Sequence, residues 1–209
     1  GVTQGIHYTS HGEKPDLLLS LLKADQDTAL VFTRTKHRAD RLGRMLGSAG
    51  HRVAVLHGDR SLSQRRAALE GFRRGSFRVL VATDIAARGI DVANIGHVIN
   101  FDLPNCPEDY VHRIGRTARM KTTGRATSFV TGEDRQQLRD IERLLGHAVP
   151  LAPGSGTSLP AIHGEDSRAH RDERSAPSRS RFANRHRRPN SRGDHAEPSP
   201  RSASPAIRA

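Results

Sequence analysis

The sequence predicts an α/β domain in which helices cover both faces of an open parallel sheet. Short continuous apolar runs, such as Ala29–Phe32 and Val79–Ala82, are typical of strands that are buried on both faces of a parallel sheet. The segments between these runs carry apolar residues at helical spacing. Because strands alternate with amphipathic helices, right-handed crossovers are expected to join parallel neighbours.

The expected elements follow one another along the chain in a regular alternation. Strands are expected over residues 3–8, 29–32, 53–56, 79–82, 97–101 and 126–130, and those at 29–32 and 79–82 are continuous apolar runs. Helices are expected over residues 14–22, 36–47, 61–74 and 133–145. In the third of these helices, Leu62, Leu69 and Phe72 are the residues expected to face the core.

Length and charge limit the classes of protein to which the chain can belong. Its 209 residues are enough for one full domain and a tail, but short for two complete domains. A net charge of +12 favours a polyanionic partner, with nucleic acid before membrane. The single cysteine, Cys106, excludes an internal disulfide and a cysteine-cluster zinc site, which is compatible with a reducing compartment.

The start of the chain bears on its location and completeness. The sequence has no apolar run of about 18 residues and no signal-peptide pattern, so the cytoplasm is the expected location and no membrane partner is expected. The chain opens at Gly1 rather than at a methionine and enters a strand-like segment almost at once. This suggests a fragment of something longer.

The apolar periodicity stops at about Leu151. A folded domain is therefore expected over residues 1–150, and a disordered Arg/Ser/Pro-rich tail over residues 151–209. Residues 152–209 hold 11 arginines and no lysine against 6 acidic residues, and too little apolar surface to offset the entropy of ordering the chain. The arginine clusters suit a salt-sensitive contact with phosphates, and a solubilising tail without a partner is the alternative.

Polar residues directly follow the predicted strands, at Thr33–Thr35, His57–Asp59 and Thr83–Asp84. Ligands of open parallel sheets gather beyond the carboxyl ends of the strands, so these residues lie where a site is expected. The segment Ala82–Val92 adds carboxylates, an arginine and a glycine that could serve a ribose hydroxyl and a phosphate. The alternative is a strand-to-loop turn in which Asp84 acts as a cap.

The segment His112–Arg119 packs three arginines and a histidine into a short stretch. Arg113, Arg116 and Arg119 recur every third residue, so on a helix or helical turn they would share roughly one face. The planar fork of arginine matches phosphate oxygens, which points to a triphosphate or a nucleic-acid backbone as the partner. A solvated basic helix face is the alternative.

Taken together, residues 1 to about 148 resemble the second RecA-like domain of the DEAD-box RNA helicases, most closely the bacterial RhlE type. The resemblance is carried by five stretches in the family's order and spacing: Val31–Lys36, Leu56–Asp59, Arg65, Ala82–Val92 and His112–Arg119. The last motif opens with His112 and Arg113, where several related helicase families use glutamine. This favours DEAD-box helicases over those relatives.

The resemblance implies a RecA-like fold and a role for each matching residue. Arg116 and Arg119 resemble the arginine fingers that stabilise charge on the γ-phosphate of ATP during phosphoryl transfer. Asp91 resembles the ribose-binding residue, and Gly89, His112 and Arg113 belong to the stretches that meet ATP at the domain interface. The positions implied to hold the RNA sugar–phosphate backbone, without readout of the bases, are Thr35, Gly58, Asp59, Arg65 and Thr83.

Two positions depart from the family's pattern. The family places glutamine three residues before Arg65, where this chain has Leu62, and Gln64 is displaced. The glutamine that makes the family's supporting hydrogen bond is therefore not at this position, and Leu62 is expected to pack. The family also commonly has glycine at position 118, where this chain has Ala118. The extra methyl is expected to be tolerated if the backbone there is helical.

The chain has no Gly-Lys pair and no Asp-Glu-Ala-Asp run. The phosphate loop and the acidic residues that hold magnesium are thus missing, and the resemblance assigns both to the family's first RecA-like domain, which binds ATP with Mg. The chain is therefore expected to be the C-terminal half of an ATP-dependent RNA helicase, inactive alone and working with an N-terminal RecA-like domain in cis. A stand-alone, non-catalytic RNA-binding or regulatory module is the alternative, and a DNA-translocating relative is less favoured.

Overall fold

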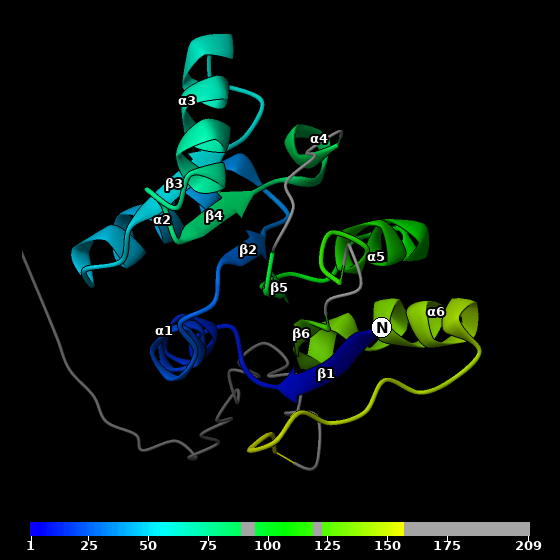
Figure 1. The fold of residues 1–209 in the computed structure, drawn as a ribbon. Helices are drawn as coiled ribbons and strands as arrows, with labels where there is room; N and C mark the ends of the chain where they lie inside the picture. Colours follow the sequence, from blue (N-terminus) through cyan, green and yellow to red (C-terminus); the bar gives the residue numbers. More distant parts are fainter. Residues whose placement is uncertain (89–94, 119–122, 157–209) are drawn as a thin grey trace, which may run out of the picture. The chain divides into compact units, whose positions relative to one another are not determined.

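All strands run parallel in one six-stranded sheet with the order β1-β6-β5-β2-β4-β3 (Figure 1). The computed structural model describes residues 1–88, 95–118 and 123–156, all of which fall within one compact unit, Gly1–Glu165. The strands are β1 (Val2–Tyr8), β2 (Ala29–Phe32), β3 (Val53–Leu56), β4 (Val79–Ala82), β5 (His97–Asn100) and β6 (Gly124–Val130). The predicted parallel α/β architecture is confirmed.

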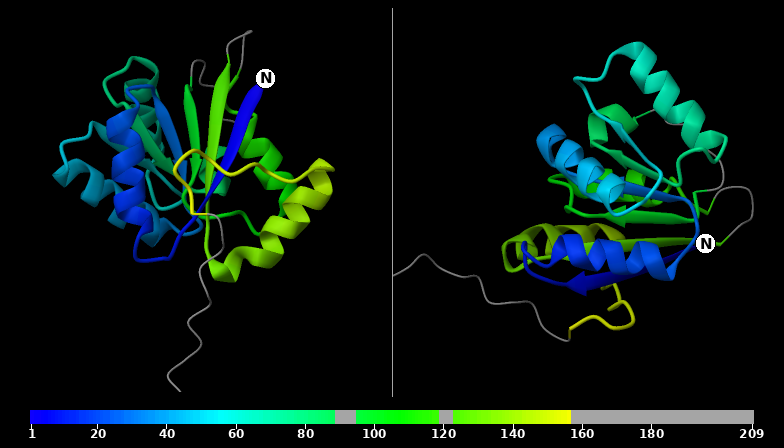
Figure 2. Two further views of the ribbon diagram at one scale, coloured as in Figure 1. Left: turned by 90° about the horizontal axis from the view of Figure 1, so that it is seen from below. Right: turned by 90° about the vertical axis from the view of Figure 1, so that its left-hand side faces the viewer.

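Helices connect the strands and cover both faces of the sheet. They are α1 (Lys14–Ala24), α2 (Lys36–Ser48), α3 (Leu62–Arg73), α4 (Asp84–Ala87), α5 (Pro107–Ile114) and α6 (Arg135–Leu145), with a 3-10 turn η1 (Gly132–Asp134) before the last. On one face, Leu18 of α1 and Leu46 of α2 pack on Val31 and Val81. On the other face, the apolar residues of α3, α5 and α6 pack on alternate side chains of the same strands. Figure 2 shows blue α1 and yellow-green α6 on opposite sides of the strands.

The register of the strands aligns their carboxyl ends. Phe32 of β2 pairs with Ala82 of β4 and with Asn100 of β5, and Ala82 also pairs with Leu56 of β3. The last residues of four strands therefore lie level with one another. The polar residues that follow them emerge side by side, which builds the site at this edge of the sheet.

The element boundaries agree closely with those expected from the sequence, with two helices missed and one core residue misplaced. The short helix α4 and helix α5 were not expected as separate elements. Leu62 was expected to face the core, but its side chain is 65% exposed at the first position of α3. The helix is instead fixed at its start by a capping box, in which Ser61 and Gln64 bond each other's backbone N–H groups.

The chain continues past α6 along the outer edge of β1. The N–H of Ile6 donates to the carbonyl of Pro150 at 2.9 Å, and the N–H of Ala152 donates to the carbonyl of Ile6 at 2.8 Å. The N–H of Tyr8 donates to Oγ of Ser155 at 3.1 Å. Contacts with the sheet thus reach beyond the boundary expected at residue 150, and the remainder of the expected tail, 157–209, lies outside the described residues. In the part of the chain that the structure describes, no helix has the length and apolar character needed to cross a membrane.

Candidate functional site

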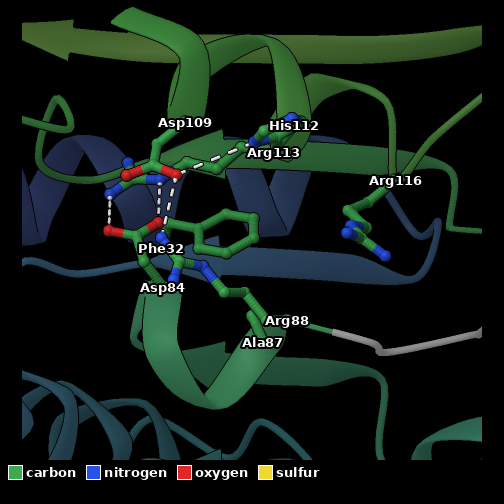
Figure 3. Close-up of a pocket in the computed structure, with 8 residues that line it drawn as sticks. All are labelled: Phe32, Asp84, Ala87, Arg88, Asp109, His112, Arg113 and Arg116. Carbon is green, nitrogen blue, oxygen red and sulfur yellow. Dashed lines mark hydrogen bonds and ion pairs between the residues drawn. The ribbon is translucent and has the colours of Figure 1, made fainter. Parts of the chain in front are cut away.

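A pocket of about 240 Å³ opens at the carboxyl edge of the sheet, between α4 and α5. Its walls combine an aromatic ring, two carboxylates and four basic side chains (Figure 3). The lining residues are Phe32, Asp84, Ala87, Arg88, Asp109, His112, Arg113 and Arg116. Three of the residues expected to meet ATP, namely His112, Arg113 and Arg116, are thus brought together in one pocket.

Arg113 forms the rigid wall of this pocket. Its guanidinium donates to both carboxylate oxygens of Asp84, from Nε at 2.6 Å and from Nη2 at 2.7 Å. Its Nη1 donates to Oδ1 of Asn100 at 3.0 Å and to the carbonyl of Asp102 at 2.7 Å. The guanidinium also lies 4.8 Å from the centre of the Phe32 ring, in a cation–π contact. The side chain is buried, and its hydrogen-bonding groups are directed to the protein.

Arg113 and Arg116 do not share a helix face as the spacing suggested. Helix α5 ends at Ile114, and Gly115 caps it with a backbone hydrogen bond to Val111. Arg113 therefore turns inward from the last turn of the helix. Arg116 lies in the turn that follows the helix, and its backbone N–H donates to the carbonyl of Arg113 at 3.0 Å. Figure 3 shows Arg116 across the pocket from Asp84.

A single carboxylate links two basic side chains of the pocket. Asp109 in the first turn of α5 lies 3.5 Å from Nη2 of Arg88 and 3.8 Å from Nδ1 of His112. Arg88 and His112 are both largely exposed, so each can move toward a bound anion. Because exposed polar contacts of this length are weak, they leave these two side chains available to a ligand.

Ala118 adopts a left-handed backbone conformation, with φ of 55°. The extra methyl relative to glycine was expected to be tolerated in a helical backbone, but the backbone is not helical there. The left-handed region costs a residue with a side chain roughly 1–2 kcal/mol. The preceding residue, Thr117, is buried and anchors the turn by a hydrogen bond from its hydroxyl to the carbonyl of Ile95.

Three residues of the expected ATP site lie outside the described residues. They are Gly89, Asp91 and Arg119.

The residues expected to hold RNA lie along the same edge of the sheet. Thr35 caps α2 by accepting a hydrogen bond from the N–H of Arg38 at 3.2 Å, and Thr83 precedes α4. Gly58 and Asp59 follow β3 and are exposed, and Arg65 lies in the first turns of α3. A side chain added at Gly58 would meet open space, so its backbone is accessible to a ligand.

The loop that contains Gly58 and Asp59 is tied to α2. The carboxylate of Asp59 forms an ion pair with Nζ of Lys36 at 2.7 Å. The hydrogen bond that Lys36 donates in this pair lowers the pKa of the Asp59 carboxyl. One residue earlier, buried His57 shares Oδ1 of Asp40 with Arg60, at 3.0 and 2.6 Å. These pairs hold the loop against the start of α2, so Thr35 and Asp59 form one surface.

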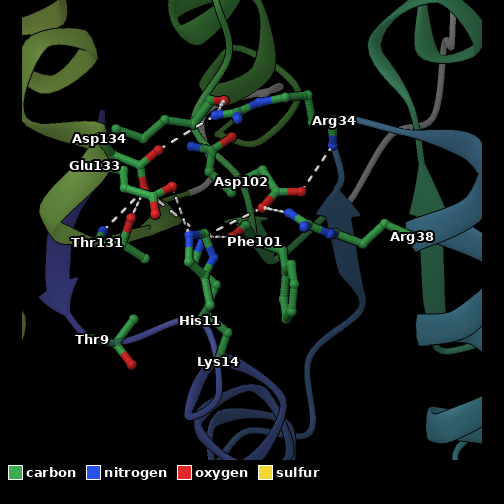
Figure 4. A network of polar contacts seen from close by, with 12 residues as sticks. Thr9, His11, Lys14, Arg34, Arg38, Phe101, Asp102, Thr131, Glu133 and Asp134 are labelled. Carbon is green, nitrogen blue, oxygen red and sulfur yellow. Dashed lines mark hydrogen bonds and ion pairs between the residues drawn. The ribbon is translucent and has the colours of Figure 1, made fainter. Parts of the chain in front are cut away.

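A buried polar network lies beside the pocket and was not expected from the sequence (Figure 4). Asp102, which follows β5, accepts hydrogen bonds from Nη1 of Arg38 at 2.6 Å, from the N–H of Arg34 at 3.0 Å and from Nζ of Lys14 at 3.3 Å. Burial alone would raise the pKa of Asp102, but these donors bring its pKa below the usual range. Burial lowers the pKa of Lys14, opposed by Asp102 and Asp134.

Asp102 connects the two parts of the site. Its carboxylate fixes Arg34 and Arg38 at the start of α2, where RNA is expected, and its carbonyl receives Arg113 of the pocket. The signal available in the sequence was its position close behind a strand, since Asp102 lies two residues after β5, while Thr33, His57 and Thr83 directly follow β2, β3 and β4.

Comparisons with known proteins assign the chain to a family. Residues 13–121 match the helicase conserved C-terminal domain. The chain is 42% identical over 177 residues to the ATP-dependent RNA helicase RhlB of Shewanella sediminis, and 44% identical over 152 residues to RhlB of Shewanella frigidimarina. These alignments cover 84% and 72% of this chain, but only 41% and 35% of the relatives, so the chain spans about two fifths of their length.

Solved structures agree with this result. The Escherichia coli DEAD-box protein SrmB bound to the regulator of ribonuclease activity A matches with a TM-score of 0.70 and 34% identity, over 77% of this chain and 97% of that chain. A DEAD box protein from Methanococcus jannaschii matches with a TM-score of 0.69 and 37% identity, over 72% of this chain and 42% of that chain. Yeast Dbp5 bound to RNA and ADP BeF3 matches with a TM-score of 0.65 and 34% identity, over 71% of this chain and 41% of that chain.

The relatives named support the RhlB type rather than the RhlE type expected from the sequence. The family model, these relatives and the parallel RecA-like sheet all lead to one assignment. The chain belongs to the helicase conserved C-terminal domain family, as the second RecA-like domain of a DEAD-box RNA helicase.

Proposed function

We propose that this chain is the half of a bipartite ATP-dependent RNA helicase that completes the ATP site and grips the RNA backbone. The first RecA-like domain would hold ATP with Mg, and closure of the two domains would bring Arg116 and Arg119 to the γ-phosphate. The observation that supports this proposal is the placement of the basic pocket and the expected RNA residues along one edge of the sheet.

Within this proposal, the basic residues of the pocket divide their tasks. Arg116, His112 and Arg88 line the open pocket and would face the nucleotide. The guanidinium of Arg113 donates its hydrogen bonds to Asp84, Asn100 and the carbonyl of Asp102. It therefore acts as a positioning residue that fixes α5 against α4. Its role is thus to hold the turn that carries Arg116, rather than to contact ATP itself.

The RNA contacts would be independent of sequence. Thr35, Gly58, Asp59, Arg65 and Thr83 offer a hydroxyl, backbone N–H groups and a guanidinium, which suit phosphates and riboses rather than base edges. The domain would then hold one RNA strand by its sugar–phosphate backbone while the two closed domains hydrolyse ATP.

The test measures ATP hydrolysis in the two-domain protein and in the 209-residue chain. Arg116→Ala in the two-domain protein is expected to lower kcat by about 10³-fold, since an arginine finger contributes about 10³–10⁵. The matched control is Arg139→Ala on the exposed face of α6, which is expected to keep full activity. Robust hydrolysis by the 209-residue chain alone, lost in Arg116→Ala, would overturn the proposal. RNA binding without any stimulation of ATP hydrolysis in the two-domain protein would favour the stand-alone RNA-binding module.

A further inference from the structure

Helix α2 carries a row of basic side chains that the ATP and RNA motifs do not include. His37, Arg38, Arg41 and Arg44 recur at helical spacing, so they lie on neighbouring turns of the helix. The opposite side of α2 is buried through Ala39, Leu42, Gly43 and Leu46. The basic row is therefore fixed on the outer side of the layer formed by α1 and α2.

The row lines two adjoining hollows in the surface. The first, of about 430 Å³, is formed by Thr35, His37, Arg38, Asp40, Arg41 and Arg44. The second, of about 270 Å³, lies between α1 and α2, shares Arg38 and Arg41 with the first, and adds His11 and apolar side chains such as Met45. We call the two hollows together the α2 basic groove.

The charges of the groove are only partly compensated, since Arg38 pairs with Asp102 and the charge of Arg44 helps to lower the pKa of the Asp40 carboxyl. Asp40 is the acidic residue in its wall, and its carboxylate is already shared by His57 and Arg60. Arg41 is exposed, and among residues 1–88, 95–118 and 123–156 no hydrogen-bond or ion-pair partner is present for it. The groove therefore presents a concentrated positive potential to an anion.

One of the basic side chains is held in place before any ligand arrives. Nη1 of Arg38 is bound to Oδ1 of Asp102 at 2.6 Å, and the Asp102 side chain is buried. This anchor restricts the rotamers of Arg38, so less side-chain entropy is lost on binding. Arg38 lies between the two hollows, which makes it the fixed point of the groove.

The groove begins where the proposed RNA contacts end. Thr35, the cap of α2, is both a residue expected to hold the RNA backbone and part of the wall of the first hollow. From Thr35 to Arg44 the helix advances by about 14 Å at about 1.5 Å per residue. This length suits a few nucleotides of a single strand that leaves Thr35.

We propose that the α2 basic groove binds the phosphate backbone of the RNA segment that flanks the stretch held at Thr35. This inference rests on the proposed function and extends its RNA path from the edge of the sheet onto the outer side of α2. An acidic protein segment carries similar charge, but continuity with Thr35 favours RNA.

The experiment removes two guanidiniums from the groove of the full 209-residue chain. The variant is Arg41→Ala/Arg44→Ala, and the matched control is Arg135→Ala/Arg139→Ala on α6, which packs on the other face of the sheet. All four positions are exposed, and alanine favours helix, so both variants are expected to fold like the parent. The basic tail is the same in every protein compared.

The measurement is equilibrium binding of an unstructured oligouridine that is long enough to extend from Thr35 onto the α2 basic groove. Binding is measured over a series of salt concentrations. The groove variant is expected to lose about tenfold in affinity at low salt, and its plot of log K against log salt to flatten by about 1.4, since each lost phosphate contact on a single strand accounts for about 0.7. The control is expected to match the parent.

The outcomes separate this inference from the proposed function. RNA binding by the parent with equal affinity in the groove and control variants would overturn the groove alone. No RNA binding by the parent would overturn the RNA part of the proposed function and the groove together. If polyglutamate bound the parent as tightly as RNA and lost its affinity only in the groove variant, the surface would be a site for an acidic protein, and the assignment to RNA would be wrong.

Discussion

Arg113 and Asp84 form a paired contact with two parallel hydrogen bonds, 2.6 Å and 2.7 Å long, that joins the end of α5 to the start of α4. The two residues are 29 positions apart in the sequence. The Arg113 side chain is 2% exposed and that of Asp84 26%, so the guanidinium is withdrawn from water while the carboxylate stays near the pocket. The pair thus sets the distance between the two helices that bound the pocket.

Asp84→Asn is expected to destabilise the domain by about 3 kcal/mol, because removal of one partner leaves a buried charge uncompensated, and such losses are about 3–5 kcal/mol. Urea unfolding of the parent and the variant measures the difference. The matched control is Asp109→Asn, which removes a carboxylate of the same pocket whose partner, Arg88, is largely exposed. That change is expected to cost less than about 1 kcal/mol. Equal losses of stability in the two variants would show that the Arg113–Asp84 pair stabilises the domain no more than the exposed Arg88–Asp109 pair does.

The layout of the fold could be predicted from the sequence because it depends on local patterns. Fully apolar tetrads such as Ala29–Phe32 need cover on both faces, and this requirement alone indicates a parallel sheet between helices. The position of the site followed from the same reasoning, since polar residues after such strands gather at one edge. The family resemblance then gave each residue an expected role.

The direction of individual side chains could not be predicted in this way. Arg113 and Arg116 look equivalent in a repeat of three, yet the helix ends between them, and one arginine turns to a buried carboxylate supplied by α4. Leu62 stands at a helix start where the periodicity continues, but the sheet does not reach it. Lys14 and Asp102 meet across 88 positions, and no local pattern connects them. Each of these features depends on partners that are distant in the sequence.

Ala118→Gly is expected to stabilise the domain by up to about 1 kcal/mol. Glycine adopts the left-handed backbone at φ of 55° without the cost of roughly 1–2 kcal/mol that alanine carries. Part of this gain is offset, because glycine raises the conformational entropy of the unfolded chain, which lowers the free energy of unfolding by about 0.4–1 kcal/mol. Thermal or urea unfolding measures the net change. The control is Ala49→Gly at the end of α2, where φ is −83° and the same substitution should destabilise. A loss of stability in both variants would contradict a strained backbone at Ala118.

His97 is a buried histidine whose pKa is strongly shifted by its surroundings. It begins β5 at the edge of the sheet opposite the pocket, is 3% exposed, and bonds Oγ1 of Thr127 through Nε2 at 2.8 Å. Burial lowers its pKa to about 4, opposed by Asp27 and reinforced by His7. Its Nδ1 lies 3.3 Å from Asp25, which is itself paired with Arg125. The imidazole is therefore held neutral in the folded protein at pH 7.

The stability of the domain should consequently fall as the pH is lowered from about 6.5 to about 4. In this window His97 is protonated in the unfolded chain but neutral in the folded protein, so protonation favours unfolding. The contribution of neutral His97 to the free energy of unfolding is fully present above the unfolded pKa of about 6.5. A difference of about 2.5 in pKa, at about 1.36 kcal/mol for each unit, amounts to about 3 kcal/mol at the lower end. Urea unfolding at pH 7, 5.5 and 4.5 measures this slope. His97→Gln keeps a group that can bond Thr127 and should flatten the slope, leaving the smaller part due to His7 and His51, whose pKa values are also lowered by burial. His147→Gln, at an exposed position after α6, should leave the slope of the parent unchanged, and an equal slope in the parent and in His97→Gln would exclude His97 as its source.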